Sequence, residues 1–211
     1  MLSKKNLLTN WKLYVITDSL FTTSQHLADR VSEAINGGAS VIQLRDKRAT
    51  DDQLISLSKS ILTISKPKNV PLIINDRIRV ARLSGANGVH LGQEDGDLKE
   101  AREALGESAI IGRSTHSRDQ ALKAQAEGFD YIGVGPIFQT PTKPNYEVVG
   151  LELVQFAAKN IRIPFVAIGG INESNAAMVR QAGAKTIAVV RAVMANEDPR
   201  LAAKLLIERM N

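Results

Sequence analysis

Residues 140–143 form a short polar segment whose side chains suit the binding of an anion. Thr140 and Thr142 supply two hydroxyl groups and Lys143 supplies an ammonium group, while Pro141 stiffens the backbone between the threonines. Two hydroxyl donors beside one cation are typical of a site for a phosphate ester. The same residue types are also common in solvated turns. This segment alone therefore leaves both interpretations open.

A second group of polar residues lies at the end of an apolar run at residues 40–44 and just after it. Gln43, Arg45 and Lys47 alternate along an extended segment, which predicts that their side chains point to one side. Two cations and an amide that face the same way favour a polyanion such as a diphosphate. The alternative is that Arg45 pairs with a carboxylate of the protein itself, and the two roles are compatible.

Two aspartates follow the next two apolar runs. Asp76 comes directly after Asn75, and Asp95 lies in the segment Gly92-Gln93-Glu94-Asp95. Two carboxylates with no thiol or imidazole close by in sequence suit Mg²⁺, which proteins commonly hold by one or two carboxylates and substrate phosphates. The alternative is that Asp76 caps the helix that begins near Arg77 and that Asp95 lies in a solvated turn.

Three further features are weaker signals. Gly169-Gly170 would let a phosphate approach backbone N–H groups, although many tight turns use the same pair. Ser114 has no recognisable hydrolase relay around it. His116 could act as a general acid or base, but a structural hydrogen-bonded role is the alternative. His90 is predicted to be packed within a strand or tied to the backbone.

The elements that must position these residues are predicted by an alternation of short apolar runs with segments of helical periodicity. Glycines such as those at 85, 106, 128 and 183 follow the helical segments as stop signals. The predicted strands are Leu13–Thr17, Ser40–Leu44, Val70–Ile74, Gly88–Leu91, Ala109–Gly112, Tyr131–Val134, Pro164–Ile168 and Thr186–Val190. The predicted helices are Ser24–Asn36, Asp51–Ser65, Arg77–Ser84, Leu98–Leu105, Arg118–Glu127, Leu151–Lys159, Glu173–Gln181 and Pro199–Arg209.

Eight such units in 211 residues predict an α/β fold, a single (β/α)8 TIM barrel over residues 1–211 with an N-terminal extension at 1–11. Nearly continuous apolar strands are expected of a parallel sheet that is covered on both faces. An open doubly wound sheet is the main alternative. In a barrel, the carboxyl ends of the strands form the active site, so the polar residues above should meet there.

Composition narrows the classes of function. Hydrophobic residues make up 44% of the chain and aromatic residues only 4%, and the net charge is +5. Sparse aromatics do not favour nucleic-acid binding, whereas a modest positive field suits small phosphorylated substrates. The absence of cysteine excludes disulfides and thiolate metal sites. No apolar run is long enough to span a membrane and no signal peptide is recognisable, so we expect a cytoplasmic protein. The sequence is also compatible with assembly into a homo-oligomer.

Taken together, these motifs resemble the thiamine phosphate synthase family, and the matches run along nearly the whole chain in family order. The stretches that carry the resemblance are Tyr14-Val15-Ile16-Thr17-Asp18, Gln43-Leu44-Arg45-Asp46-Lys47, Ile74-Asn75-Asp76-Arg77, Gly88 to Asp95, Ser114-Thr115-His116, Gly133 to Phe138 with Thr140 to Lys143, and Ala167-Ile168-Gly169-Gly170-Ile171.

The resemblance implies an enzyme that joins a pyrimidine diphosphate to a thiazole phosphate, giving thiamine phosphate and diphosphate. By the same resemblance, the pyrimidine diphosphate would be held by Gln43, Arg45, Lys47, Asn75, Ser114 and Lys143, among which Ser114, Lys143 and Arg45 are the expected catalytic residues. Asp76 and Asp95 would bind Mg²⁺. The thiazole phosphate would be held by Thr140, Thr142, Gly170, Val190 and Arg191.

One position departs from the family pattern, and two other functions remain open. The family often has Val-Ser where this chain has Val190-Arg191, which removes a hydroxyl donor and adds a charge that could contact the phosphate or point outward. A thiazole tautomerase would use His116 as its acid and base and would need no Mg²⁺. A barrel that binds a phosphorylated metabolite as a sensor would catalyse neither reaction.

Overall fold

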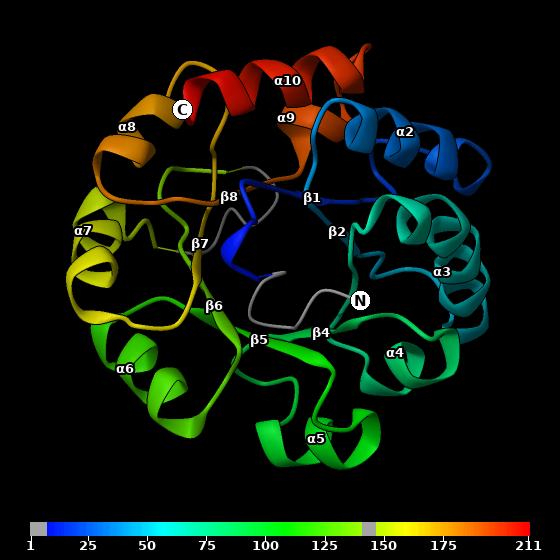
Figure 1. Ribbon diagram of the computed structural model, residues 1–211, viewed down its shortest axis with the longest axis horizontal. Helices are drawn as coiled ribbons and strands as arrows, with labels where there is room; N and C mark the ends of the chain where they lie inside the picture. The colour runs from blue at the N-terminus through cyan, green and yellow to red at the C-terminus, as the bar shows by residue number, and fades with distance from the viewer. Residues whose placement is uncertain (1–7, 141–146) are drawn as a thin grey trace.

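Eight parallel strands form a closed barrel, and the helices surround it (Figure 1). The computed structural model describes residues 8–140 and 147–211. Each strand pairs with its neighbours in chain order. The ring closes between the last strand and the first, where Leu13 lies opposite Ile187. This closure confirms the predicted TIM barrel and excludes the open doubly wound sheet.

All eight predicted strands are present; β4 and β6 have the expected bounds, and the bounds of the other six differ by one to three residues. The strands are β1 (Leu13–Ile16), β2 (Val41–Leu44), β3 (Leu72–Asn75), β4 (Gly88–Leu91), β5 (Ile110–Thr115), β6 (Tyr131–Val134), β7 (Phe165–Ile168) and β8 (Ile187–Val189). The largest difference is at β5, which continues beyond Gly112 and so carries Arg113 and Ser114 within the strand itself.

The helices alternate with the strands as expected. They are α2 (Ser24–Asn36), α3 (Asp51–Ser65), the 3-10 helix η1 (Lys66–Lys68), α4 (Ile78–Ser84), α5 (Leu98–Leu105), α6 (Arg118–Glu127), α7 (Gly150–Asn160), α8 (Ala176–Gln181), α9 (Arg191–Met194) and α10 (Pro199–Arg209). The predicted start of α8 at Glu173 is wrong. Residues 172–175 form a turn in which the Ser174 N–H donates to Asn172 Oδ1 at 2.9 Å.

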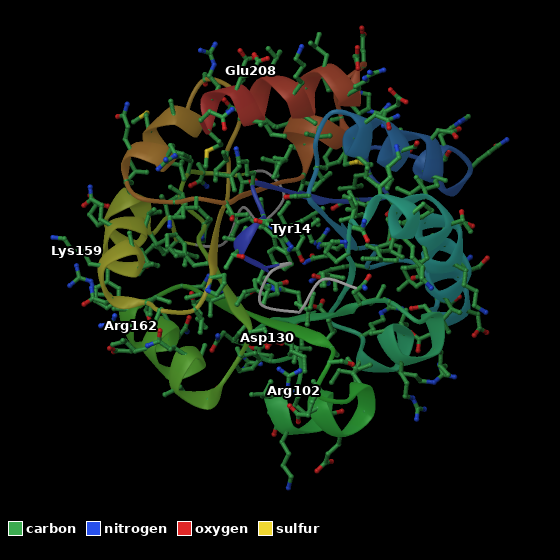
Figure 2. All side chains as sticks on the ribbon, viewed as in Figure 1. Tyr14, Arg102, Asp130, Lys159, Arg162 and Glu208 are labelled. Atoms are coloured by element: carbon green, nitrogen blue, oxygen red, sulfur yellow. The ribbon has the colours of Figure 1, made fainter. Side chains whose placement is uncertain are left out.

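Two layers of apolar side chains hold the barrel together. The larger layer lies between the sheet and the helices, for example at Leu72, Val80 and Val89. The smaller layer fills the barrel interior, and its buried members are Leu8, Trp11, Tyr14, Ile16, Val41, Ile73, Ile110, Tyr131, Val166 and Ala188. Figure 2 shows Tyr14 near the centre of the ring, whereas Lys159 and Glu208 project from its outer edge.

A glycine makes room for the ring of Tyr131 in the interior layer. A Cβ atom on Gly112 would lie 2.2 Å from Cζ of Tyr131, which is fully buried on the adjacent strand. Below this ring, Trp11 packs edge-on against Tyr131, with ring centroids 5.0 Å apart. Aromatic rings therefore fill the amino-terminal end of the barrel and support the opposite end.

Within the described ranges, no helix has the length and apolar character needed to cross a bilayer.

Candidate functional site

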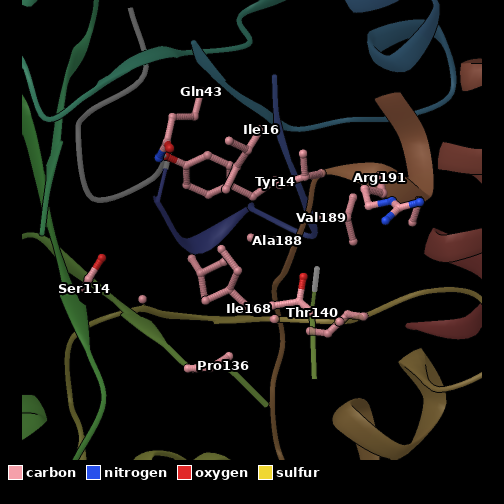
Figure 3. A pocket seen from close by; sticks show the side chains of 18 of the residues that line it. Tyr14, Ile16, Gln43, Ser114, Pro136, Thr140, Ile168, Ala188, Val189 and Arg191 are labelled. Atoms are coloured by element: carbon pink, nitrogen blue, oxygen red, sulfur yellow. The ribbon is translucent and has the colours of Figure 1, made fainter. Parts of the chain in front are cut away.

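A cavity of about 550 Å³ opens at the carboxyl ends of the strands (Figure 3). Aliphatic side chains such as Ile16, Val166 and Ile168 form part of its wall. Many of the residues singled out in the sequence also line it: Gln43, Arg45, Asn75, Ser114, His116, Thr140, Gly170, Val190 and Arg191. The barrel therefore brings together residues that lie up to about 150 positions apart in the chain, as expected of this fold.

The floor of the cavity is a continuous chain of hydrogen bonds. Gln43 Nε2 donates to the Tyr14 hydroxyl at 2.8 Å, and the Tyr14 and Tyr131 hydroxyl oxygens lie 2.9 Å apart. His90 contacts the Tyr131 hydroxyl through Nδ1 at 2.9 Å and the Ser114 hydroxyl through Nε2 at 2.9 Å. The amide of Gln43 and the hydroxyl of Ser114 are thus oriented by the same buried network.

The two tyrosines of this network remain protonated at neutral pH. Burial raises the pKa of both Tyr14 and Tyr131 well above the ordinary value of 10.0. Neither tyrosine was given a site role from the sequence, although Tyr14 and Ile16 alternate along β1 and this period could have indicated a shared inward face. His90 is packed within its strand as expected, but it also lines the cavity, which was not predicted.

Beside this floor, Arg45 forms an ion pair with Asp18. Arg45 Nη1 contacts Asp18 Oδ2, and the side chains are 14% and 7% exposed, so the pair is shielded from solvent. The predicted alternative for Arg45, pairing with a carboxylate of the barrel, is therefore confirmed. Arg45 nevertheless lines the cavity, so the pair holds its guanidinium group at the edge of the site.

Asp76 and Asp95 meet in a smaller hollow of about 390 Å³, which Lys47 also lines and which Asn75 shares with the main cavity. The two carboxyl groups lie within hydrogen-bonding reach of each other. Burial raises the pKa of Asp76 to about 6, and the neighbouring Asp95 carboxyl adds to this rise. Asn75 Nδ2 donates to Asp76 Oδ2 at 2.5 Å. The sequence prediction that the two aspartates converge is confirmed.

Capping of a helix does not explain Asp76. Helix α4 begins at Ile78, its N-cap residue is Arg77, and no side chain caps it. Asp76 instead has a φ of 62° in the left-handed region, where aspartate is tolerated better than most residues. The alternative role as an N-cap is therefore wrong.

This pair of carboxylates has the chemistry of a binding site for a hard divalent cation. Two like charges held together repel each other, and a cation would remove that repulsion. The oxygen-only donors match the preference of Mg²⁺, which keeps the rest of its coordination for water and phosphate. In the part of the chain that the structure describes, no group of three or more His, Cys, Asp or Glu side chains could hold a metal ion alone.

The opposite side of the cavity is formed by the ends of β7 and β8. Gly170 has a φ of 64°, and a Cβ atom there would lie 2.6 Å from the Gln139 carbonyl oxygen, so only glycine fits. Asn175 Nδ2 donates to the Gly170 carbonyl at 3.0 Å and fixes this turn. Thr140 and Val190 line the same side of the cavity. This tight turn places backbone close to any ligand that enters there.

Arg191 lies on this side, across the cavity from Gln43 and Ser114 (Figure 3). Its guanidinium carbon lies 5.3 Å from the centroid of the Phe21 ring, in the loop that follows β1. The cation is thus held over an aromatic face at the rim. The sequence left open whether Arg191 faces the site or the outside, and the structure shows an exposed side chain that still lines the cavity.

Two predicted site residues, Thr142 and Lys143, lie outside the described residues. His116 lines the cavity, and its Nδ1 lies 2.5 Å from the Gly135 carbonyl oxygen, while its backbone N–H donates to Gln120 Oε1 at 2.7 Å. This tie to the backbone supports the structural role that the sequence analysis kept as an alternative.

Comparison with known proteins agrees with this site. Residues 13–193 match the family model described as thiamine monophosphate synthase. A thiamine-phosphate synthase of Chloroflexus aurantiacus is 42% identical over 200 residues, which cover 94% of this chain and 92% of the relative. A thiamine-phosphate synthase of a Synechococcus species is also 42% identical, but the chain spans only 58% of its length.

Solved structures give the same picture. A thiamine phosphate pyrophosphorylase from Pyrococcus furiosus superimposes with a TM-score of 0.89 at 38% identity, and the match covers 97% of this chain and 98% of that one. A geranylgeranylglyceryl phosphate synthase from Thermoplasma acidophilum superimposes with a TM-score of 0.74 at 16% identity. The second likeness is one of fold alone.

Proposed function

The chain belongs to the thiamine monophosphate synthase family, and from this membership we propose how the residues at its barrel mouth carry out the reaction. The protein is a transferase of thiamine biosynthesis. Its proposed substrates are 4-amino-2-methyl-5-hydroxymethylpyrimidine diphosphate and 4-methyl-5-(2-hydroxyethyl)thiazole phosphate. The products are thiamine phosphate and diphosphate. Such charged metabolites suit a cytoplasmic enzyme.

In the proposed reaction, the bond between the pyrimidine methylene carbon and the diphosphate oxygen breaks first. The electron pair leaves with the diphosphate, and the aminopyrimidine ring stabilises the cationic methylene group. The thiazole nitrogen then forms a bond to that carbon and becomes the thiazolium nitrogen of the product. No protein nucleophile is needed, so the residues act by positioning the substrates and by stabilising charge.

The pyrimidine is assigned to the floor of the cavity. Gln43 and Ser114 present an amide and a hydroxyl there, each fixed by the network of buried hydrogen bonds. The neighbouring walls are aliphatic, which keeps water away from the reacting carbon. Arg45, Lys47, Asn75 and Lys143 are the proposed contacts of the diphosphate. The thiazole phosphate is assigned to the opposite side, at Thr140, Thr142, Gly170, Val190 and Arg191.

Asp76 and Asp95 are the proposed ligands of Mg²⁺. When bound, Mg²⁺ would stabilise the negative charge that develops on the leaving diphosphate. What supports this assignment most directly is the closeness of the two carboxylates to each other and to Lys47, in a hollow that shares Asn75 with the cavity. A carboxylate pair beside cations and a hydroxyl-lined cavity matches the charge pattern of a metal-bound diphosphate.

The test is an assay of diphosphate release in which the pyrimidine diphosphate, the thiazole phosphate and Mg²⁺ are omitted in turn. We expect release only when all three are present. Asp95→Asn should slow turnover at limiting Mg²⁺ by at least tenfold and leave folding intact, because Asp95 is exposed on a loop. Isomerisation of the thiazole phosphate without diphosphate release would indicate a tautomerase. Binding of the phosphorylated compounds with neither reaction would indicate a sensor.

A further inference from the structure

Asp95 lies on a short exposed loop, residues 92–96, between β4 and α5. Its Oδ2 atom accepts a hydrogen bond from the Gly92 N–H at 2.8 Å, so the carboxylate closes the loop on itself. An exposed loop of this length samples many conformations unless other parts of the protein hold it. In addition, the nearby Asp76 carboxylate repels that of Asp95 when both are ionised. Something must therefore keep Asp95 in place.

The guanidinium group of Arg113 holds this loop from the neighbouring strand. Arg113 Nη1 donates to the Gly96 carbonyl oxygen at 2.6 Å, and Nη2 donates to the Gln93 carbonyl oxygen at 3.0 Å. The two accepting carbonyl groups lie on either side of Asp95 in the chain. The planar fork of an arginine can bind two acceptors at fixed directions, which an ammonium group cannot do.

Two further contacts support this arrangement. The Arg113 guanidinium lies 5.5 Å from the centroid of the Phe129 ring, which is buried at the end of α6. Gln93 Nε2 donates back to the Ser114 carbonyl oxygen at 2.5 Å. Strand β5 thus directs Ser114 into the cavity, and the residue before it, Arg113, holds the loop that carries Asp95. The strand links the floor of the cavity to the carboxylate pair.

We propose that Arg113 is a positioning residue for the divalent-cation site. It touches neither the cation nor the substrates. It holds loop 92–96 so that Asp95 stays beside Asp76 before the cation binds, and the cation then meets a site that is already formed. This inference rests on the proposed function, because it concerns the cation that Asp76 and Asp95 are proposed to bind.

The test is calorimetric titration of Mg²⁺ into the protein saturated with inorganic diphosphate. Arg113→Met keeps an apolar side chain of similar length against Phe129 but loses both hydrogen bonds. We expect its Mg²⁺ affinity to fall about tenfold, as is typical when a residue that supports a metal ligand is removed. Arg113→Lys keeps the positive charge but lacks the planar fork that fixes both carbonyl groups, and it should give an intermediate loss.

A matched control is available on the other side of the barrel. Arg30 of α2 also holds two backbone carbonyl groups, with Nη2 donating to that of Met194 at 2.8 Å and to that of Asn196. Arg30→Met removes the same kind of contact and should leave Mg²⁺ affinity unchanged. Amide hydrogen exchange adds a readout that needs no cation: the Gly92 N–H should exchange faster in Arg113→Met than in Arg30→Met.

Each outcome decides the question. Weaker Mg²⁺ binding and faster Gly92 exchange in Arg113→Met, with Arg30→Met unaffected in both, would support the proposal. Unchanged Mg²⁺ affinity in a folded Arg113→Met protein, or an equal loss in Arg30→Met, would overturn it while the proposed function stands. Failure of the parent protein to bind Mg²⁺ at all would reject the metal assignment, and this inference with it.

Discussion

Asp76 combines three features that bear on its role: a left-handed backbone, partial burial and a neighbouring carboxylate. Burial and Asp95 raise its pKa from 3.8 to about 6, so ionising it in the folded protein is unfavourable. The folded state therefore loses stability, relative to the unfolded chain, as the pH rises from about 4 through 6. This loss of stability falls on a carboxylate that is a proposed ligand of Mg²⁺.

We predict that Asp76→Asn stabilises the metal-free protein above pH 6. Asparagine has the same shape and tolerates a positive φ, but it carries no charge to be buried. The gain should be about 1 kcal/mol, discounted because the group is partly exposed to solvent. It should grow between pH 4 and 6 and stay constant above. Thermal unfolding with a chelator present measures it.

The same substitution should abolish the stabilisation that Mg²⁺ gives to the parent protein. Asp29→Asn on the exposed face of α2 serves as the control and should change neither quantity. A lower melting temperature for metal-free Asp76→Asn at pH 8 would contradict this account of Asp76.

Arg191 differs from the residue that the family often has at its position, and its effect can be isolated. We predict that Arg191→Ala raises KM for the thiazole phosphate about tenfold and changes KM for the pyrimidine diphosphate less than twofold, because the guanidinium lies across the cavity from the pyrimidine side. Steady-state kinetics with each substrate varied in turn gives both values.

Phe21→Leu provides the matched control for Arg191, because it removes only the ring under the guanidinium. It should raise KM for the thiazole phosphate in the same direction but by less. Equal effects of Arg191→Ala on both substrates would place the action of Arg191 elsewhere.

At the scale of elements, the interior of the barrel depends on the fit between β5 and β6. We predict that Gly112→Ala destabilises the protein by about 1–3 kcal/mol, since its Cβ atom would overlap the buried Tyr131 ring. Denaturant unfolding measures the loss. Gly133→Ala on β6 is the matched control, because its Cβ atom would lie 3.4 Å from His90 Cε1, close to ordinary contact. Equal losses in the two variants would contradict this explanation.

The strands and most helices could be predicted because each leaves a local pattern in the sequence. Strands that are covered on both faces are apolar throughout, and long helices show their period. Helix α9, with four residues, is too short to show one. The start of α8 was misplaced because the polar side chains of residues 172–175 resemble a helix start but form a separate turn.

The residues of the site also fall into those that the sequence predicts and those that only the structure reveals. Charged and amide residues that follow strands, such as Arg45 and Asp76, could be singled out because their position alone predicts convergence. The contact between Tyr14 and Tyr131 joins residues 117 positions apart, and it depends on the space above Gly112. Arg113 has the position of an outward-facing strand residue, and its role becomes visible only when loop 92–96 is placed beside it.

For the molecule as a whole, the excess of positive charge should assist anionic substrates. The net charge is +5, and both proposed substrates carry phosphate groups. Raising the NaCl concentration from ~0.1 to ~1 M shortens the screening distance from about 10 to 3 Å. We predict that kcat/KM falls for both substrates, and more for the diphosphate, while kcat changes little. Sucrose at matched osmolality controls for water activity, and an unchanged kcat/KM would exclude this attraction.

The rings of Trp11, Tyr14 and Tyr131 fill the barrel at the amino-terminal ends of its strands, so the cavity is open only at the carboxyl ends. Both proposed substrates would therefore enter through the same opening by which both products leave. Spent diphosphate has to vacate its place before the next pyrimidine diphosphate can take it, and added diphosphate should therefore inhibit in competition with that reactant.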